Sequence, residues 1–263
     1  MIKWKKFHIS FFAKSRRVGA GKNNFQNSSN PKYHGVQELL NNEVALKNYN
    51  FHTIKLLTAA LKEVNHESRI LEFGAGTGTL SLIFQEKYRA NIKCVEIDEI
   101  LVEQLKKRGF ETYPSVQESN SRYTGIFSSN VLEHIEDDAK YLKILNDFLE
   151  PGGHLAIYVP AFPILFSDLD RNVGHVRRYR KQELVKKIED AGMIVDYCNY
   201  ADSIGFIASF AIKVFGFNTK SGLGSVPALR IYDRLIFPFS LLLDSIGLRK
   251  IIGKNLIVSA RKH

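Results

Sequence analysis

The sequence of 263 residues has few cysteines, only Cys94 and Cys198. Both lie in apolar runs that are typical of strands, so a disulfide-stabilised scaffold and a cysteine-based zinc site are excluded, and a reducing compartment fits. With 44% hydrophobic and 24% charged residues, the composition excludes disordered, collagen-like and coiled-coil proteins. A chain of this length buries a sizeable core without cross-links.

Negative charge is missing from residues 1–37, which contain eight Lys and Arg but no Asp or Glu. The remainder therefore accounts for only +2 of the net charge of +10. Apolar residues alternate with these cations, which suits an anionic membrane surface or nucleic acid. A loosely ordered leader is the simpler interpretation. We expect a basic arm and linker here; it lacks the apolar core of a secretory signal, and an organelle-targeting leader stays open.

Long apolar runs are also missing. The stretches 204–217 and 235–243 are almost wholly apolar, but each is shorter than the about 20 residues that span a membrane as a helix. We expect them to pack over the sheet as an apolar helical insert, residues 202–253, on the acceptor side. Membrane contact is the alternative, and the insert could also cover a pocket for an apolar acceptor.

Strand and helix patterns alternate along the rest of the chain. This alternation predicts an α/β protein with a doubly wound, Rossmann-like, seven-stranded, mostly parallel sheet. Residues 38–201 form this domain, the insert precedes the last strand, and 254–263 close the sheet. The expected strands are 69–73, 92–96, 110–116, 125–129, 155–159, 194–197 and 256–260.

A glycine-rich bend follows the first of these strands. Its spacing is G-x-G-x-G, and Thr79 stands where a dinucleotide fingerprint has its third glycine. Glu72 precedes the first glycine by two residues, where a carboxylate repels a diphosphate and attracts an ammonium group. A nicotinamide oxidoreductase is therefore the least favoured enzyme class.

A second acid, Glu96, closes the second strand 20 residues after Gly76. A carboxylate at this point of a nucleotide-binding sheet accepts both hydroxyls of a ribose. One acid for an ammonium group, a bare backbone and one acid for a ribose together predict a site for S-adenosylmethionine. The alternative is a tight turn with incidental acids.

Four segments, residues 72–78, 94–98, 128–135 and 149–155, resemble the class I S-adenosylmethionine-dependent methyltransferases. The later pattern over 170–179 is similar to a bacterial, small-molecule subgroup whose acceptor is unknown. The resemblance implies S-adenosylmethionine as cofactor and S-adenosylhomocysteine as product. It assigns Glu72 to the donor's amino end, Glu96 and Ile97 to its ribose and adenine, and Gly74, Ala75, Gly76, Gly78 and Asn130 to the rest of the cofactor site.

Methyl transfer to an oxygen also requires that a proton be removed. One candidate base is His134, which follows the fourth strand. The simpler interpretation of His134 is a histidine that only forms a hydrogen bond with the backbone. His175 lies in a charged segment, 168–179, that we expect to be a loop above the crevice, and we expect it to be the general base. Arg177, Arg178 and Tyr179 are expected to bind the acceptor; the alternative is an ion-pair network that stiffens the loop.

Metal binding is not expected. Some relatives bind magnesium through Glu-x-x-Glu-His, but Asn130 replaces the first carboxylate here. The sequence thus predicts a cytoplasmic methyltransferase, with association with a membrane as the alternative location, that acts on a small, anionic or lipid-like acceptor. Its alternatives are an RNA or protein methyltransferase that uses the basic arm, with nucleic acid the less favoured partner, and a non-catalytic donor-binding module.

Overall fold

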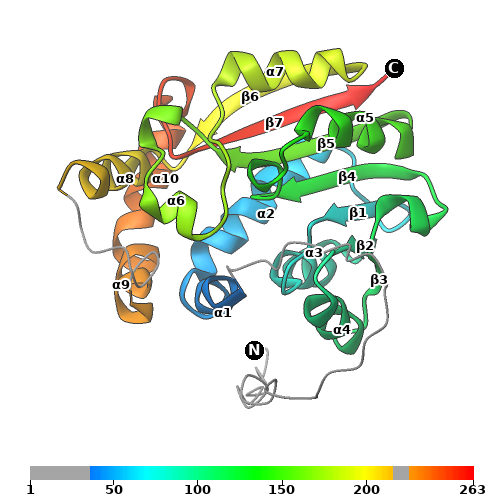
Figure 1. Cartoon of the computed structure of the whole chain (residues 1–263), viewed down its shortest axis with the longest axis horizontal. Helices are drawn as coiled ribbons and strands as arrows, with labels where there is room; N and C mark the ends of the chain where they lie inside the picture. The colour runs from blue at the N-terminus through cyan, green and yellow to red at the C-terminus, as the bar shows by residue number, and fades with distance from the viewer. Residues whose placement is uncertain (1–35, 216–224) are drawn as a thin grey trace, which may run out of the picture. The chain divides into compact units, whose positions relative to one another are not determined.

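The computed structural model describes residues 36–215 and 225–263; the basic arm lies outside them. Within these residues the strands form one seven-stranded sheet in the order β3-β2-β1-β4-β5-β7-β6 (Figure 1). The strands are β1 (Arg69–Phe73), β2 (Asn91–Val95), β3 (Glu111–Tyr113), β4 (Tyr123–Ser129), β5 (Leu149–Pro160), β6 (Met193–Ala201) and β7 (Asn255–Lys262).

Strands β1 to β5 pair in parallel, and β7 is antiparallel to both β5 and β6. This confirms the doubly wound, mostly parallel sheet. The strand order reverses between β1 and β4, because β1 pairs with β2 on one side and with β4 on the other. In open α/β sheets, ligands bind outside the carboxyl ends of the strands at such a switch point.

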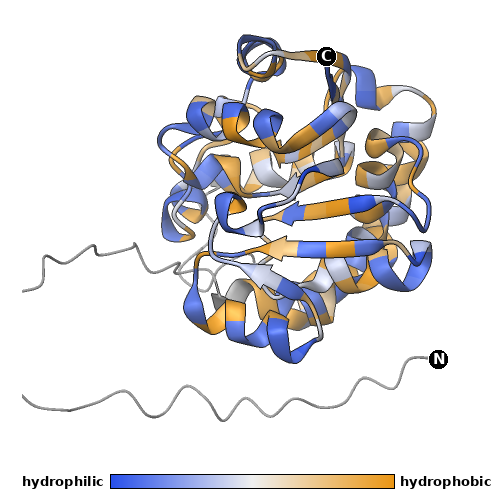
Figure 2. Cartoon of the chain, turned by 90° about the vertical axis from the view of Figure 1, so that its right-hand side faces the viewer, coloured by the Kyte–Doolittle hydropathy of each residue, from blue (hydrophilic) through white to orange (hydrophobic). Residues whose placement is uncertain are grey.

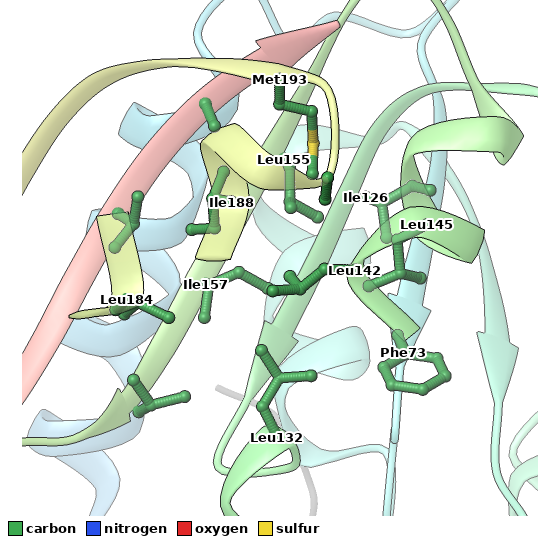
Figure 3. Close-up of a cluster of buried hydrophobic side chains, with 14 of the residues drawn as sticks. Phe73, Ile126, Leu132, Leu142, Leu145, Leu155, Ile157, Leu184, Ile188 and Met193 are labelled. Atoms are coloured by element: carbon green, nitrogen blue, oxygen red, sulfur yellow. The ribbon is translucent and has the colours of Figure 1, made fainter. Parts of the chain in front are cut away.

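Helices cover both faces of the sheet, and apolar side chains from each face form a separate core. On one face, Leu142, Leu145 and Ile188 belong with Ile126 to one cluster of buried side chains (Figure 3). Because both faces are buried, a strand such as β1 shows no alternation between buried and exposed residues. The helices of the domain are α1 (Val36–Ala45), α2 (Lys47–Leu61), α3 (Thr79–Tyr88), α4 (Glu99–Lys107), α5 (Asp138–Phe148), α6 (Asp168–Asn172) and α7 (Lys181–Asp190).

Figure 2 shows hydrophobic and hydrophilic segments along the same helices, as expected where one side of a helix faces the sheet and the other faces solvent. Helix α4 is an example, since Leu101 and Leu105 are buried and the basic Lys106 and Lys107 follow in its last turn. Asp98 begins this helix, and its carboxylate accepts the N–H groups of the first turn.

The insert between β6 and β7 is helical, as predicted. It consists of α8 (Ser203–Phe215), α9 (Val226–Ile231), the π-helical η6 (Tyr232–Ile236), α10 (Phe237–Ser245) and the 3-10 turn η7 (Leu248–Lys250). Helix α9 runs through η6 into α10 without a break in helical backbone. Among the helices that the structure describes, none combines the length and the apolar character needed to cross a membrane.

Two local predictions were wrong. Strand β5 begins at Leu149, not at residue 155, because the stretch around Gly152 continues the strand and does not merely end the preceding helix. Its first residue pairs with Tyr123, and the register then shifts by a bulge. The segment 168–179 is not all loop, since it begins with the short helix α6.

Candidate functional site

The bend after β1 depends on glycine. Gly74, Gly76 and Gly78 have φ angles of 77°, 55° and 77°, a region that side chains with a Cβ rarely adopt. A Cβ on Gly74 would lie 2.3 Å from a methyl group of Val131, in the segment that follows β4. Gly74 and Ala75 both donate their N–H to the carbonyl of Val95, at 2.9 and 3.0 Å. The bend is therefore fixed to the end of β2.

Glu96 lies beside this bend. One carboxylate oxygen accepts the N–H of Gly76 at 2.7 Å, and the other accepts those of Ile97 and Asp98 at 2.8 and 3.0 Å. Burial raises the pKa of Glu96, although these three N–H groups act in the opposite direction. A carboxylate has about four lone-pair sites, so three bonds leave it capacity for a ligand hydroxyl.

Unlike Glu96, Glu72 directs its carboxyl group toward helix α3. Its carboxyl group is 2% exposed and accepts a hydrogen bond from the hydroxyl of Ser81, on α3 below the bend. Burial raises the pKa of Glu72 to about 8, so the group is mostly neutral at pH 7. This placement favours a structural role, and the expected contact with the donor's amino group stays a prediction.

Two further predicted cofactor residues are exposed at the same edge of the sheet. Ile97 follows β2 with its side chain 55% exposed. Asn130 follows β4, has a φ of 55°, and donates its N–H to the carbonyl of Tyr158 at 2.8 Å. A bare backbone bend, a carboxylate and an exposed aliphatic side chain fit a nucleoside such as that of S-adenosylmethionine. These residues would hold it between the ends of β1, β2 and β4.

Helix α1 covers the bend, which sequence reasoning missed. A Cβ on Gly76 would lie 3.1 Å from a methyl group of Leu39. Glu43 accepts the hydroxyl of Thr79 at 2.9 Å and the guanidinium of Arg108 at 2.9 Å. No local signal in the sequence reveals these contacts, because they join distant segments.

The two predicted catalytic histidines lie next to each other, with ring centres 4.7 Å apart. Nδ1 of His134 is 3.1 Å from the carbonyl oxygen of Gly174. A carbonyl only accepts, so we assign the proton of neutral His134 to Nδ1 and a lone pair to Nε2. Burial, and then the charge of His175, lower the pKa of His134 to about 4. This backbone bond agrees with the simpler interpretation of His134.

His175 is oriented by a buried acid. Its Nδ1 lies 2.9 Å from a carboxylate oxygen of Asp170, and the same oxygen accepts Nε–H of Arg178 at 2.8 Å. Burial alone would raise the pKa of Asp170, but these two hydrogen bonds outweigh it and hold the pKa below its usual range. A histidine held by a carboxylate on one nitrogen is the arrangement of an oriented general base.

The three residues expected to bind the acceptor make hydrogen bonds within the protein. Arg178 is 7% exposed and Tyr179 is fully buried. The Tyr179 hydroxyl donates to Asp138 at 2.8 Å, and Arg177 pairs with the same acid at 2.9 Å. This geometry favours the alternative, an ion-pair network that stiffens the segment. Acceptor binding by Arg177, Arg178 and Tyr179 stays a prediction.

Glu133 was not among the predicted catalytic residues. It is fully buried, and neither carboxylate oxygen has a hydrogen-bond partner among the described residues; Nε2 of His175 lies 3.8 Å away. Burial raises its pKa to about 8. Ligand atoms of Glu133, His134 and His175 lie within 4.8 Å of one another and could hold a metal ion. Two imidazoles suit zinc better than magnesium; the absence of a metal stays a prediction.

A pocket of about 450 Å³ lies elsewhere, between the α1–α2 junction and the insert. Lys47, Arg230 and Arg234 line it together with Asp233. The Asp233 carboxylate accepts the N–H of Tyr49 at 2.8 Å and so caps α2. No residue of the glycine bend belongs to its lining, so this pocket is separate from the predicted cofactor site.

Comparison with known proteins identifies the family. Residues 45–196 match the model of a methyltransferase domain, whereas no curated protein matches the chain. A chain of the Haloferax volcanii Trm112 methyltransferase activator complex aligns with a TM-score of 0.59 and 12% identity, covering 90% of this chain and 100% of that one.

Two other solved structures are similar in fold. The geranyl diphosphate methyltransferase bound to its substrate and sinefungin has a TM-score of 0.56 at 10% identity, with 81% of this chain and 78% of that chain covered. The mycolic acid cyclopropane synthase CmaA1 has a TM-score of 0.55 at 12% identity, with coverages of 80% and 83%. The family match spans more than half of the sequence, and the chain therefore belongs to the methyltransferase-domain family, with the class I fold of the S-adenosylmethionine-dependent enzymes.

Proposed function

We propose that this protein transfers the methyl group of S-adenosylmethionine to a small-molecule acceptor that is anionic or lipid-like. The observation that carries the proposal is the bond from Gly76 to Glu96, which places a carboxylate against a bare backbone bend at the switch point of the sheet. When bound there, S-adenosylmethionine supplies an electrophilic methyl group on a sulfonium.

The chain itself contributes to the chemistry in two ways: it positions the two reactants, and one of its side chains accepts a proton. In-line methyl transfer gains most from correct placement of the two reactants. His175 is the proposed base, because Asp170 orients its Nδ1 and leaves Nε2 as the proton-accepting nitrogen. Its Nε2 faces Glu133 at 3.8 Å, and a neutral carboxyl there does not compete for the proton.

The apolar insert supports an apolar or lipid-like acceptor. Its helix α8 contacts the segment after β5, where the rings of Phe162 and Phe206 meet at 5.0 Å. The same segment leads into α6, which carries Asp170. The fold accommodates such acceptors elsewhere, since geranyl diphosphate, the substrate named for one structural neighbour, is both anionic and apolar.

Transfer of a labelled methyl group tests the proposal. The full chain is incubated with methyl-labelled S-adenosylmethionine and a cell extract, which is then separated into low-mass, lipid, RNA and protein fractions. Label is expected in the low-mass or lipid fraction. Glu96→Ala should abolish it, whereas Glu99→Ala, an exposed acid on α4, should not.

Other outcomes contradict the proposal. Label confined to the RNA or protein fraction would favour a macromolecular acceptor and a role for the basic arm. Donor binding without label in any fraction would favour the non-catalytic module.

His175→Ala should reduce turnover without changing donor affinity, and His134→Ala should have a smaller effect.

A further inference from the structure

The helix that runs through α9, η6 and α10 differs from an ordinary surface helix because its exposed side is apolar. Its buried side contains the polar residues Asp233, Ser240 and Asp244 together with the apolar Leu229 and Phe237. Its outward stripe is apolar, with side chains between 56% and 75% exposed. Surface helices normally bury the apolar stripe and expose the polar one. The outward stripe consists of Ile231, Leu235, Phe239, Leu242 and Ile246.

Internal hydrogen bonds explain the polar residues of the buried side. Asp244 accepts the N–H of Asp202 at 2.9 Å, and Ser240 donates to the Asp202 carboxylate at 2.9 Å. Tyr232 donates to that carboxylate at 2.7 Å, and Asp233 caps α2. These polar contacts, together with the buried Leu229 and Phe237, hold the insert against the domain, and the outward stripe stays exposed.

The apolar exposure is concentrated in the insert. Ten of the sixteen large apolar side chains exposed in the described part of the chain belong to it, although it supplies only about a fifth of those residues. Helix α8 adds Ile207, Phe210 and Val214, spaced by three and four residues. A concentration of exposed large apolar side chains in one part of a protein indicates a binding surface.

The exposed charges in the described part of the insert all have the same sign. Its three acids, Asp202, Asp233 and Asp244, are buried. Among the residues of 202–253 that the structure describes, the exposed charged side chains are all cationic, namely Lys213, Arg230, Arg234, Arg249 and Lys250. Apolar side chains flanked by cations match a bilayer surface with anionic headgroups.

We propose that the exposed apolar and cationic side of α8, α9, η6 and α10 docks on a membrane surface that contains anionic lipids. The chain would lie on the bilayer with the outward stripe at the level of the acyl boundary and exposed cations of the insert near the headgroups. A second copy of the chain fits this surface less well, because the exposed charges of the described insert are all cationic and face-to-face contact would offer them no exposed acid of the insert as a partner.

Vesicle co-sedimentation of the full chain tests this docking. Binding is expected to phosphatidylglycerol vesicles, to weaken with salt, and to be much lower with pure phosphatidylcholine. Leu235→Ser with Phe239→Ser should lower the partition coefficient at least about tenfold. Ile100→Ser is the matched control, since Ile100 on α4 is 62% exposed and should not affect binding.

Fluorescence gives a second, independent readout. The chain has one tryptophan, Trp4, so Phe239→Trp adds a single reporter to a constant background. Vesicles with brominated acyl chains should quench the Phe239→Trp protein more than the Ile100→Trp protein. Arg249→Gln with Lys250→Gln should reduce binding to anionic vesicles and flatten its salt dependence.

Two results would overturn the proposal, and each supports a different explanation. Equal binding by the Leu235→Ser/Phe239→Ser and Ile100→Ser proteins would overturn the proposal and assign binding to another part of the chain, such as the arm. A concentration-dependent dimer that these insert substitutions abolish, without vesicle binding, would overturn it in favour of a second copy. Donor affinity, measured in parallel, should be unchanged in every insert variant, so failure of docking is separable from failure of the proposed methyl transfer.

Discussion

The carboxylate of Glu96 accepts the N–H of Gly76 at 2.7 Å and thereby joins the end of β2 to the bend that follows β1. The same bend is tied to β2 by the two N–H groups that donate to Val95. A ligand hydroxyl that reaches Glu96 therefore meets a group whose position is already fixed by the sheet, and this preorganisation limits the entropy lost on binding.

Adding a side chain to the bend should destabilise the protein. Gly74→Ala combines a φ of 77° with a Cβ only 2.3 Å from Val131, so we expect a loss of about 3 kcal/mol in the free energy of unfolding. In a Val131→Ala background the added loss should fall by about 1 kcal/mol, because the contact is relieved but the strain remains. Urea denaturation measures both.

Gly109→Ala is the control. Gly109 also has a positive φ, 91°, but a Cβ there meets nothing within 4 Å. Its substitution should therefore cost only the conformational strain, about 1 kcal/mol. Equal losses at Gly74 and Gly109 would show that the contact with Val131 does not contribute.

Glu72 should make stability depend on pH above the ordinary titration range of a carboxyl group. Its folded pKa of about 8 is raised above the unfolded value of 4.5, so its contribution is complete below about pH 4.5 and is lost as the pH rises through 8. Glu72→Gln mimics the neutral form. Between pH 5 and pH 8.5 its free energy of unfolding should fall less than that of the wild type.

Glu86→Gln, an exposed substitution on the same α3 as Ser81, controls for the loss of a charge. It should leave the pH dependence of unfolding close to that of the wild type. Parallel curves for the wild type and Glu72→Gln would contradict the buried, neutral assignment. Donor affinity should survive Glu72→Gln if the role of Glu72 is structural.

Asp170 should act in the opposite direction. Its folded pKa is lowered, so its contribution is present above the unfolded value of about 3.9 and is lost as the pH falls through the folded one. Asp170→Asn leaves the buried Arg178 without its carboxylate, and should cost about 3 kcal/mol at pH 7. The difference from wild type should shrink in acid.

Asp168→Asn is the matched control for that substitution. Asp168 pairs with Arg171 at 2.6 Å, but the side chains are 80% and 62% exposed, and exposed pairs of this kind contribute little. Chemical denaturation at pH 3 to 7 should show almost no change for it. A comparable loss for both substitutions would contradict the importance of burial at Asp170.

The alternation of strands and helices and the glycine bend were accessible from the sequence because they depend on local patterns. The direction in which each side chain points was not accessible from the sequence. Glu72 lies in a strand buried on both faces, so no alternation distinguishes a carboxyl group that faces a ligand from one that faces α3. Arg178 and Tyr179 were expected to bind the acceptor. Arg178 instead bonds Asp170 in its own segment, and Tyr179 bonds Asp138, which only the fold brings near.

The insert shows a similar limit. Its apolar runs correctly predicted helices, but hydrophobicity alone does not say which stripe faces inward. The inward direction is set by Asp202 and Asp244, which bond to each other's segments across about forty residues. Such long-range polar contacts leave no periodic signal, so the apolar character of the exposed side of α10 appears only in the structure.

Metal removal tests the cluster at Glu133. At pH 7 a carboxyl group with a pKa of about 8 must lose a proton before it binds a cation, and Asn130 supplies no carboxylate. We therefore expect the melting temperature at pH 7 to be unchanged by a chelator and by added zinc. A zinc-dependent rise that is lost in His134→Ala and His175→Ala would contradict this and identify a metal site.

Calorimetric titration with S-adenosylmethionine tests the central claim most directly. The wild-type chain should bind it, and Glu96→Ala should weaken binding at least tenfold, because hydrogen bonds to a charged group contribute about 1.5–3 kcal/mol each; Glu99→Ala should bind normally. Unchanged affinity in Glu96→Ala, or a wild-type chain that binds a dinucleotide diphosphate in place of S-adenosylmethionine, would contradict the account.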